Sequence, residues 1–324
     1  MVFPDIHMHR KRRILGIVLA GTVVLCGAAL GLAQPETQQV TSPPTPPGKR
    51  YRIQLLRPEK VGQTSRVVVS GSQKLVTTTT PATEPPKCEK FAFEVKGIRR
   101  VLGTDRQGRT TKVAFTVDNC VKIEGQNKTE VVAQGTVVIA SMAGGGKLDI
   151  RCKDPNVTLS DSGSGIVGKF IGMHMPTELD SEKVFGTDKP RRVGESWPID
   201  RELVAKSFRD QNGKEGKLKK EDVTGQMKLA GVTKVDGIEC LDLRAEMRFS
   251  GFLSMAEHWM TAEKSEISFT IASMLPVDPS VPELVETTEI AFTMVVKFNI
   301  TGNERKVETT AVERTVTKST PISK

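Results

Sequence analysis

The stretch that decides the fold is residues 290–300, with the sequence IAFTMVVKFNI. Its large apolar side chains fall on every second position, at Ile290, Phe292, Met294, Val296, Phe298 and Ile300. Period-two alternation is typical of an extended strand with one face against a core, because successive side chains point to opposite faces of a sheet. We therefore predict a long, half-buried strand here.

The same alternation recurs on both sides of this stretch. Residues 241–249 place apolar side chains at odd positions, and residues 113–123 repeat the pattern. We expect one face of the latter strand to carry Val113, Phe115, Val117, Val121 and Ile123.

Turn signals join these strands into hairpins. Asp236 and Gly237 sit between two alternating segments, and both residue types favour the positive φ of a tight primed turn. Residues 103–108 predict a looser turn, and residues 51–57 read as a further strand. Helix is scarce: residues 200–208 form the one fair candidate, with Asp200 as its cap.

Long one-sided strands with almost no helix predict an all-β chain, closed as a sandwich, a barrel or a curved sheet. We favour a large curved antiparallel sheet, half-barrel or clam-like, with one or two short helices. Two similar openings, at residues 61–63 and 193–197, suggest pseudo-repeated halves over residues 50–175 and 184–318. Two unrelated turns of common composition are the alternative.

The N-terminus has the pattern of an export signal. Four basic residues at 10–13 precede an uncharged apolar run at residues 14–32, and the small side chains of Gly31 and Ala33 fit a signal-peptidase cleavage site. We expect residues 1–33 to be a signal peptide, and an uncleaved membrane anchor is the competing interpretation. The chain is then exported, to the periplasm or the cell surface.

Proline marks two spacers. Residues 34–49 form a stiff tether, because proline lacks an amide donor and biases its neighbours toward extended backbone. Residues 81–86 read as a long loop inside the folded region. The antiparallel β domain accordingly covers residues 50–318, followed by a tail at residues 319–324.

The formal net charge is +9, but basic and acidic residues are interleaved along the chain. No single-sign stripe with aromatic residues emerges, so we exclude nucleic acid as a partner.

Four cysteines follow the signal, at Cys88, Cys120, Cys152 and Cys240. An even number in an exported protein suggests two disulfides among them. Three pairings are open. Cys120 and Cys240 both fall on the polar phase of their predicted strands, that is, among the side chains that alternate with the apolar ones, so a bridge between them would join positions on the same face. Free buried thiols are the alternative, and the wide spacing argues against a zinc site.

We expect no catalytic residue, metal or cofactor. His174 and His258 lack a nucleophile or metal partner with a recognisable pattern, so a hydrolase is the least favoured class. The glycines at residues 144–146 and the Ser-Gly run at residues 162–165 lack the setting of a phosphate loop or a nucleophile elbow, and we expect a turn and a flexible loop.

The export signal, the tether, the long alternating strands and the segment VGESW at residues 193–197 resemble uncharacterised bacterial exported proteins. These in turn look like relatives of the lipoprotein-carrier (LolA-like) and LppX-like half-barrels. The resemblance covers roughly residues 50–318. It implies a curved antiparallel sheet, covered by short helices, that cradles an acyl chain.

The sequence thus predicts a non-enzymatic cell-envelope protein that binds a lipid or another apolar ligand in a concave sheet. The aromatic side chains expected to line that face are Phe91, Phe93, Phe115, Phe292 and Phe298. A structural or protein-interaction domain of the envelope, with the same side chains filling a core, is the alternative. Expected partners are a lipid or an envelope protein, with membrane contact through residues 14–32.

Overall fold

The computed structural model describes residues 48–81, 85–142, 148–170, 180–212, 218–252, 256–257, 260–300 and 303–322. The predicted export signal and nearly all of the tether lie outside these ranges. Within them, no helix is long and apolar enough to cross a membrane.

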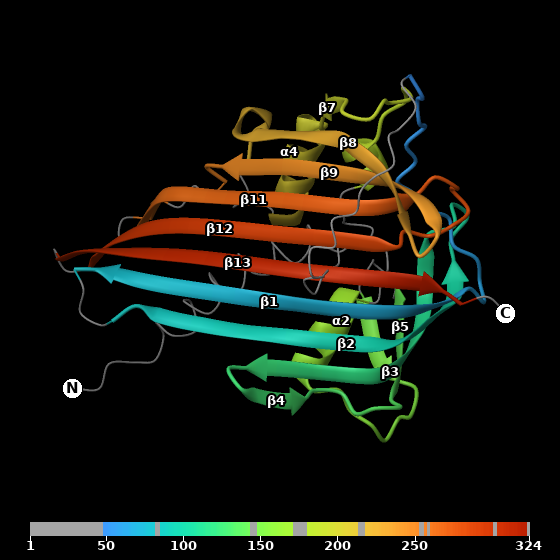
Figure 1. Ribbon diagram of the computed structural model, residues 1–324. Helices are drawn as coiled ribbons and strands as arrows, with labels where there is room; N and C mark the ends of the chain where they lie inside the picture. The colour runs from blue at the N-terminus through green and yellow to red at the C-terminus, as the bar shows by residue number, and fades with distance from the viewer. Residues whose placement is uncertain are drawn as a thin grey trace.

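The architecture is one curved antiparallel sheet of 13 strands that does not close on itself (Figure 1). Its strands are β1 (Thr64–Thr80), β2 (Lys87–Thr104), β3 (Thr110–Glu124), β4 (Asn127–Glu130), β5 (Val137–Met142), β6 (Leu148–Cys152), β7 (Ser196–Pro198), β8 (Val223–Val235), β9 (Ile238–Ser250), β10 (Ala256–Glu257), β11 (Met260–Pro276), β12 (Val285–Ile300) and β13 (Asn303–Pro321). Their order is β6-β5-β3-β2-β1-β13-β12-β11-β9-β8-β7, with β4 beside β3 and β10 beside β11. The predicted all-β class and curved antiparallel sheet are confirmed.

The two clearest alternating stretches form strands with one buried face. In β12, Ile290, Phe292, Met294 and Val296 are all buried, and in β9 the odd positions 241–249 are buried while Arg244, Glu246 and Arg248 are exposed. This face carries the core, since burial of apolar area is the main favourable term in folding.

A β-bulge overturns the predicted face of β3. Lys96 pairs with Asn119 but Gly97 pairs with Val117, which leaves Asp118 as an extra residue. One extra residue reverses the alternation beyond it. Cys120 therefore points into the core, and the prediction that Val121 and Ile123 share the face of Val117 is wrong.

The predicted turns are present. Asp236 and Gly237 join β8 to β9 with φ of 48° and 84°, as a tight primed turn requires. Residues 105–109 join β2 to β3. The predicted strand at residues 51–57 is wrong, because only an isolated bridge links Tyr51 to Arg191.

The described residues contain more helix than the one or two expected. They form α2 (Asp161–Phe170), α3 (Ser181–Phe185), α4 (Arg201–Asn212) and the short 3-10 helix η3 (Lys220–Asp222). The helix predicted after Asp200 is α4, whose Leu203 N–H donates to Asp200 Oδ1 at 2.9 Å. The loop predicted at residues 162–165 is instead the first turn of α2, which Ile166 and Val167 hold against the sheet despite its glycines.

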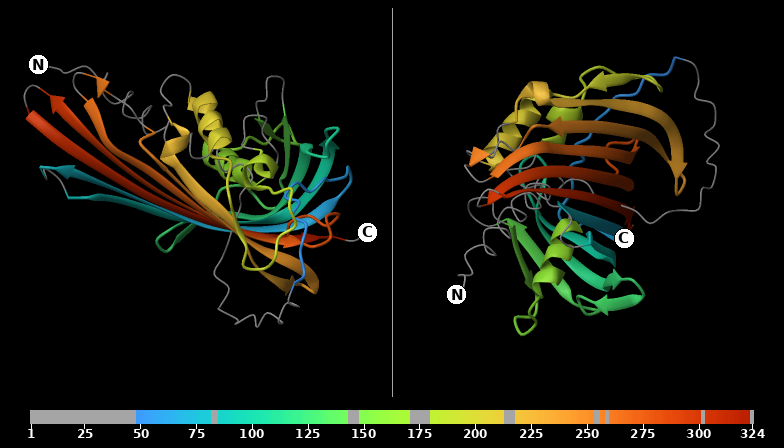
Figure 2. Two further views of the ribbon diagram at one scale, coloured as in Figure 1. Left: turned by 90° about the horizontal axis from the view of Figure 1, so that it is seen from above. Right: turned by 90° about the vertical axis from the view of Figure 1, so that its left-hand side faces the viewer.

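The α-helices lie on one side of the sheet, in its hollow, and leave the other side uncovered by described helices (Figure 2). Beneath them are two apolar clusters. Cluster A lies under α3 and α4 and is built from strands β7, β8, β9, β11 and β12 together with Tyr51 and Ile53. Cluster B lies under α2 and is built from strands β1, β2, β3 and β5.

Candidate ligand-binding face

The five phenylalanines predicted to line a pocket all belong to the hollow, inner face, but they fall into two groups. Phe91, Phe93 and Phe115 belong to cluster B, whereas Phe292 and Phe298 belong to cluster A. Phe93, Phe115 and Phe292 are only 2%, 1% and 6% exposed, so they fill the core. Phe91 and Phe298 are partly buried and lie at the margins of their clusters.

Two glycines on neighbouring strands make room for the buried rings of cluster B. A Cβ atom on Gly71 would lie 2.7 Å from Phe93 Cε1, and one on Gly97 would lie 2.6 Å from Phe115 Cζ. Each ring therefore packs across its glycine onto the backbone of the next strand. This packing explains why the sheet tolerates glycine at two interior positions.

A polar seam separates the two clusters. The inner positions of β13 include Thr309 and Thr315, and those of β12 include Glu286 and Thr288, all of them buried. Period-two spacing places these groups on the same face as the apolar residues of β12. The inner face is therefore not one continuous apolar basin.

An apolar strip crosses the seam toward the hairpin between β1 and β2. Leu75 on β1 pairs with Ala311 on β13, which pairs with Phe292 on β12. Phe91 on β2 lies opposite Gln73, one inner position from Leu75, and Phe298 lies six residues along β12 from Phe292. Of these five apolar residues, all except Phe292 are partly exposed. The ends of these strands project beyond the described helices (Figure 2). The strip, defined by Phe91, Leu75, Ala311 and Phe298, is thus an apolar margin that the helices leave uncovered.

A carboxyl pair lies at the opposite end of β11 and β12. Ser273 Oγ donates a hydrogen bond to Glu283, and Glu286 also hydrogen-bonds to it. Removal from water raises the pKa of the Glu283 carboxyl, against the opposing effects of these hydrogen bonds and of the nearby Arg57. The Arg57 guanidinium donates to Pro276 O at 2.7 Å and Asp278 O at 2.9 Å. The arrangement places two carboxyls beside each other, and Arg57 clamps the chain before β1 onto the β11–β12 turn.

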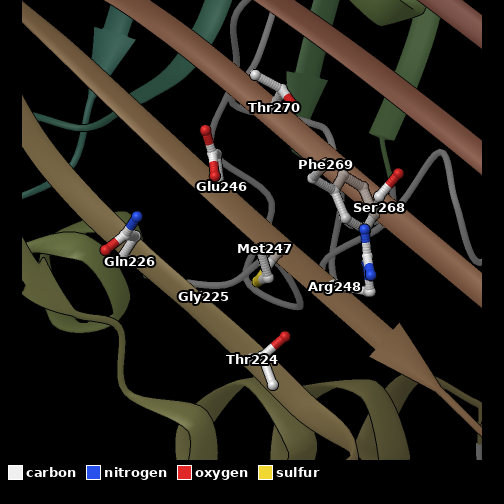
Figure 3. A pocket seen from close by; sticks show the side chains of 9 residues that line it. All are labelled: Thr224, Gly225, Gln226, Glu246, Met247, Arg248, Ser268, Phe269 and Thr270. Carbon is white, nitrogen blue, oxygen red and sulfur yellow. The ribbon is translucent and has the colours of Figure 1, made fainter.

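The outer face carries a polar hollow of about 490 Å³ across β8, β9 and β11 (Figure 3). Arg248 lies between Thr224 and Ser268, and Glu246 lies between Gln226 and Thr270. Such a hollow suits a small polar group and not an acyl chain. Sequence reasoning missed it, because exposed polar positions on alternating strands carry no distinctive signal.

The four cysteines are free thiols in the structure, so the predicted disulfides are not formed. Cys120 on β3 and Cys240 on β9 are separated by five strands, which rules out a Cys120–Cys240 bridge. Both are buried, contrary to their predicted polar phase. The bulge at Asp118 explains this for Cys120.

Cys88 and Cys120 lie on adjacent strands but are also far apart. Cys88 is exposed, and it lies seven residues along β2 from Val95, the residue opposite Cys120. The alternative of unpaired thiols therefore describes this structure.

His174 and His258 lie outside the described residues, so the structure does not test them. Among the residues that it does describe, no group of three or more His, Cys, Asp or Glu side chains is placed to hold a metal ion.

Comparison with known proteins gave only distant likenesses. No family model matches the chain, and no curated protein matches its sequence. A lipovitellin structure, solved in work on lipid–protein interactions, covers 82% of this chain at 8% identity and a TM-score of 0.33. This chain spans only 26% of that lipovitellin chain.

Two other solved structures give weaker likenesses. The match to OpdQ of Pseudomonas aeruginosa includes 80% of this chain and 98% of the OpdQ chain, with 8% identity and a TM-score of 0.19. The match to the TodX monoaromatic hydrocarbon channel includes 92% of this chain and 98% of the TodX chain, with 7% identity and a TM-score of 0.19. At these TM-scores the likenesses carry no argument about function.

Proposed function

We propose that this chain is an exported, non-enzymatic protein of the cell envelope that binds a single apolar chain, such as the acyl chain of a lipid, along the apolar strip. The observation that carries the proposal is the strip itself, in which Phe91, Leu75, Ala311 and Phe298 lie partly exposed on four adjacent strands. Partly exposed apolar area spread over neighbouring strands of a curved sheet favours an extended apolar ligand.

The energetics favour an extended ligand over a compact one. Each methylene removed from water contributes about 0.8 kcal/mol, so an acyl chain gains binding energy along its whole length. Thr309 of the polar seam lies one inner position from Ala311, so its hydroxyl would lie close to the polar end of such a ligand. The predicted relationship to the lipoprotein carriers fits this proposal and is part of it.

A second candidate is a structural domain of the envelope with no ligand. It is favoured by the burial of Phe93, Phe115 and Phe292, which fill the two clusters instead of lining an open basin.

The two candidates are separated by lipid that copurifies with the protein. Full-length protein purified gently from its native envelope should release lipid on organic extraction, as measured by mass spectrometry. Leu75→Asp and Phe298→Asp should abolish that lipid while the circular dichroism melt is retained, because both positions are partly exposed. Thr78→Asp, an exposed position on the outer face of β1, is the matched control and should keep it.

A ligand-free wild type would overturn the binding proposal and leave the structural domain as the better account. Lipid retained in both strip variants would place the ligand elsewhere. Phe292→Asp serves as the marker of a core position, because burial of an unpaired carboxylate should unfold the domain.

A further inference from the structure

The outer face of the central strands carries a basic, partly apolar patch. The central strands β1 and β13 stand side by side in the middle of the sheet order, and β2 flanks β1. Besides Arg100 and the half-buried Lys306, their outward positions carry six exposed basic residues, at Arg66, Lys74, Lys90, Lys96, Arg314 and Lys318. Val68 and Val312 lie among them, 36% and 42% exposed.

The acidic residues on this face are fewer. The acids on the outward positions are Glu94 on β2, Glu304 and Glu308 on β13 and Glu289 on the neighbouring β12. Glu94 lies 3.8 Å from Lys128. Arg66 pairs with Asp118 at 3.5 Å and Lys318 with Asp236 at 2.9 Å.

The other four basic side chains remain available. Within the part of the chain that the structure describes, Lys74, Lys90, Lys96 and Arg314 make no ion pair. The patch therefore keeps a net positive charge over three adjacent strands.

Lys74 and Lys90 stand directly opposite each other across β1 and β2. Like charges at directly opposed positions destabilise a sheet. Lysine is common on edge strands, where it blocks pairing with other chains. At Lys74, β1 has a partner strand on each side, whereas β2 pairs with β3 only from Ala92 onward, so edge protection can apply to Lys90 but does not account for Lys74.

We infer that this face docks on the surface of an anionic lipid bilayer. Positive charge around exposed valines is complementary to anionic headgroups, with the valines reaching the boundary of the acyl region. The helices lie on the opposite side of the sheet, so the outward-bowed face presents its central strands to a flat surface without obstruction by them (Figure 2). The inference rests on the outer face alone and does not depend on a ligand in the hollow.

The test uses the full chain and sedimentation with vesicles. Mixed phosphatidylglycerol–phosphatidylcholine vesicles are compared with vesicles of phosphatidylcholine alone, at low and high sodium chloride. Each basic residue near an anionic surface raises partitioning about fivefold. Lys74→Ala/Lys90→Ala should therefore weaken binding to the anionic vesicles about tenfold or more.

The control variant is Lys228→Ala/Lys234→Ala, which removes the same charge from exposed positions on β8. We expect it to change binding less than about twofold, because the charge is lost far from the patch. Lys74→Arg/Lys90→Arg should retain binding. Loss of the like-charge pair should leave the melting temperature of the alanine variant unchanged or higher, so weaker binding cannot be attributed to unfolding.

Equal binding to neutral and anionic vesicles would assign the contact to residues 14–32 and overturn the inference. Equal weakening in the β8 control, or no weakening in Lys74→Ala/Lys90→Ala, would also overturn it. Binding to an anionic polymer such as heparin but not to anionic vesicles would give the patch a different partner. None of these results alters the lipid content measured for the proposed function.

Discussion

Gly62 and Gly194 occupy equivalent places in two turns that lie 132 residues apart. Their φ angles are 89° and 90°. Gly62 N–H donates to Val101 O at 2.9 Å, and Gly194 N–H donates to Leu229 O at 2.7 Å. In each case the next residue accepts a bond back from that same strand, so the two openings recognised in the sequence share their geometry. The division into repeated halves gains support from this match and stays a prediction.

Alanine at either glycine should destabilise the protein by about 1–2 kcal/mol, because a residue with a Cβ is strained at positive φ. Neither site has an atom within 4 Å of a new Cβ, so the backbone conformation is the only cost. Urea unfolding of Gly62→Ala and Gly194→Ala measures the effect. Gly165→Ala, in an exposed position of α2 with open space around it, should instead stabilise by about 0.5–1 kcal/mol. Equal effects at all three sites would contradict the turn argument.

Gly71→Ala should cost about 1–3 kcal/mol for a different reason, since its new Cβ would overlap the Phe93 ring. The double variant Gly71→Ala/Phe93→Leu should lose less stability than the two single changes added together. Strict additivity in chemical denaturation would show that the ring does not depend on the glycine. Gly231→Ala, whose Cβ would find its nearest neighbour at 4.0 Å, is the matched control.

The ion pair between Glu59 and Arg99 should be costly to break. Arg99 Nη1 and Nη2 reach the two Glu59 oxygens at 2.6 and 2.8 Å, and the side chains are 9% and 18% exposed. Removal of one partner leaves the other charge buried and unpaired, so Glu59→Gln should destabilise the protein by about 3–5 kcal/mol. The double variant Glu59→Leu/Arg99→Met should recover most of that loss.

The exposed pair of Lys122 and Glu124 provides the comparison for this prediction. Glu124→Gln should cost less than about 1 kcal/mol. Similar losses for Glu59→Gln and Glu124→Gln in thermal unfolding would show that burial of the Glu59 pair adds nothing.

Glu283 should make stability fall as the pH rises. Its pKa in the folded chain is raised above the ordinary value of 4.5, so the folded state binds the proton more tightly than the unfolded state does. The stabilisation is complete below pH 4.5 and is lost as the pH climbs through the raised pKa. Glu283→Gln should flatten this part of the curve of urea midpoint against pH. An unchanged slope in the variant would assign the titration to another group.

Thiol titration tests the corrected cysteine assignment. Denatured, unreduced protein should expose the thiols of Cys88, Cys120, Cys152 and Cys240 to Ellman's reagent. In the native state Cys88 should react first because it is exposed, and Cys120 should be slow, since burial raises its pKa to about 11. Blocked thiols in the denatured protein would restore the disulfide prediction.

The sequence by itself determined the elements whose information is local. Alternation at residues 290–300 and 241–249 specified long strands and their buried faces, because a period of two has only one structural solution in a sheet. Asp236-Gly237 specified a hairpin through its positive φ angles, and Asp200 specified the start of α4. From these features the all-β class and the curved antiparallel sheet followed.

Only the tertiary structure decided where the faces meet. The bulge at Asp118 turned Cys120 inward, and α2 formed from a glycine-rich segment because Ile166 and Val167 could pack on cluster B. The five phenylalanines lie on the inner face, yet only strand order could separate them into core and margin. The basic patch arose in the same way, because Arg314 joins Lys74 and Lys90 only when β13 pairs with β1. Pairing between strands so distant in the chain depends on the packing of the whole sheet, which no local pattern of residues encodes.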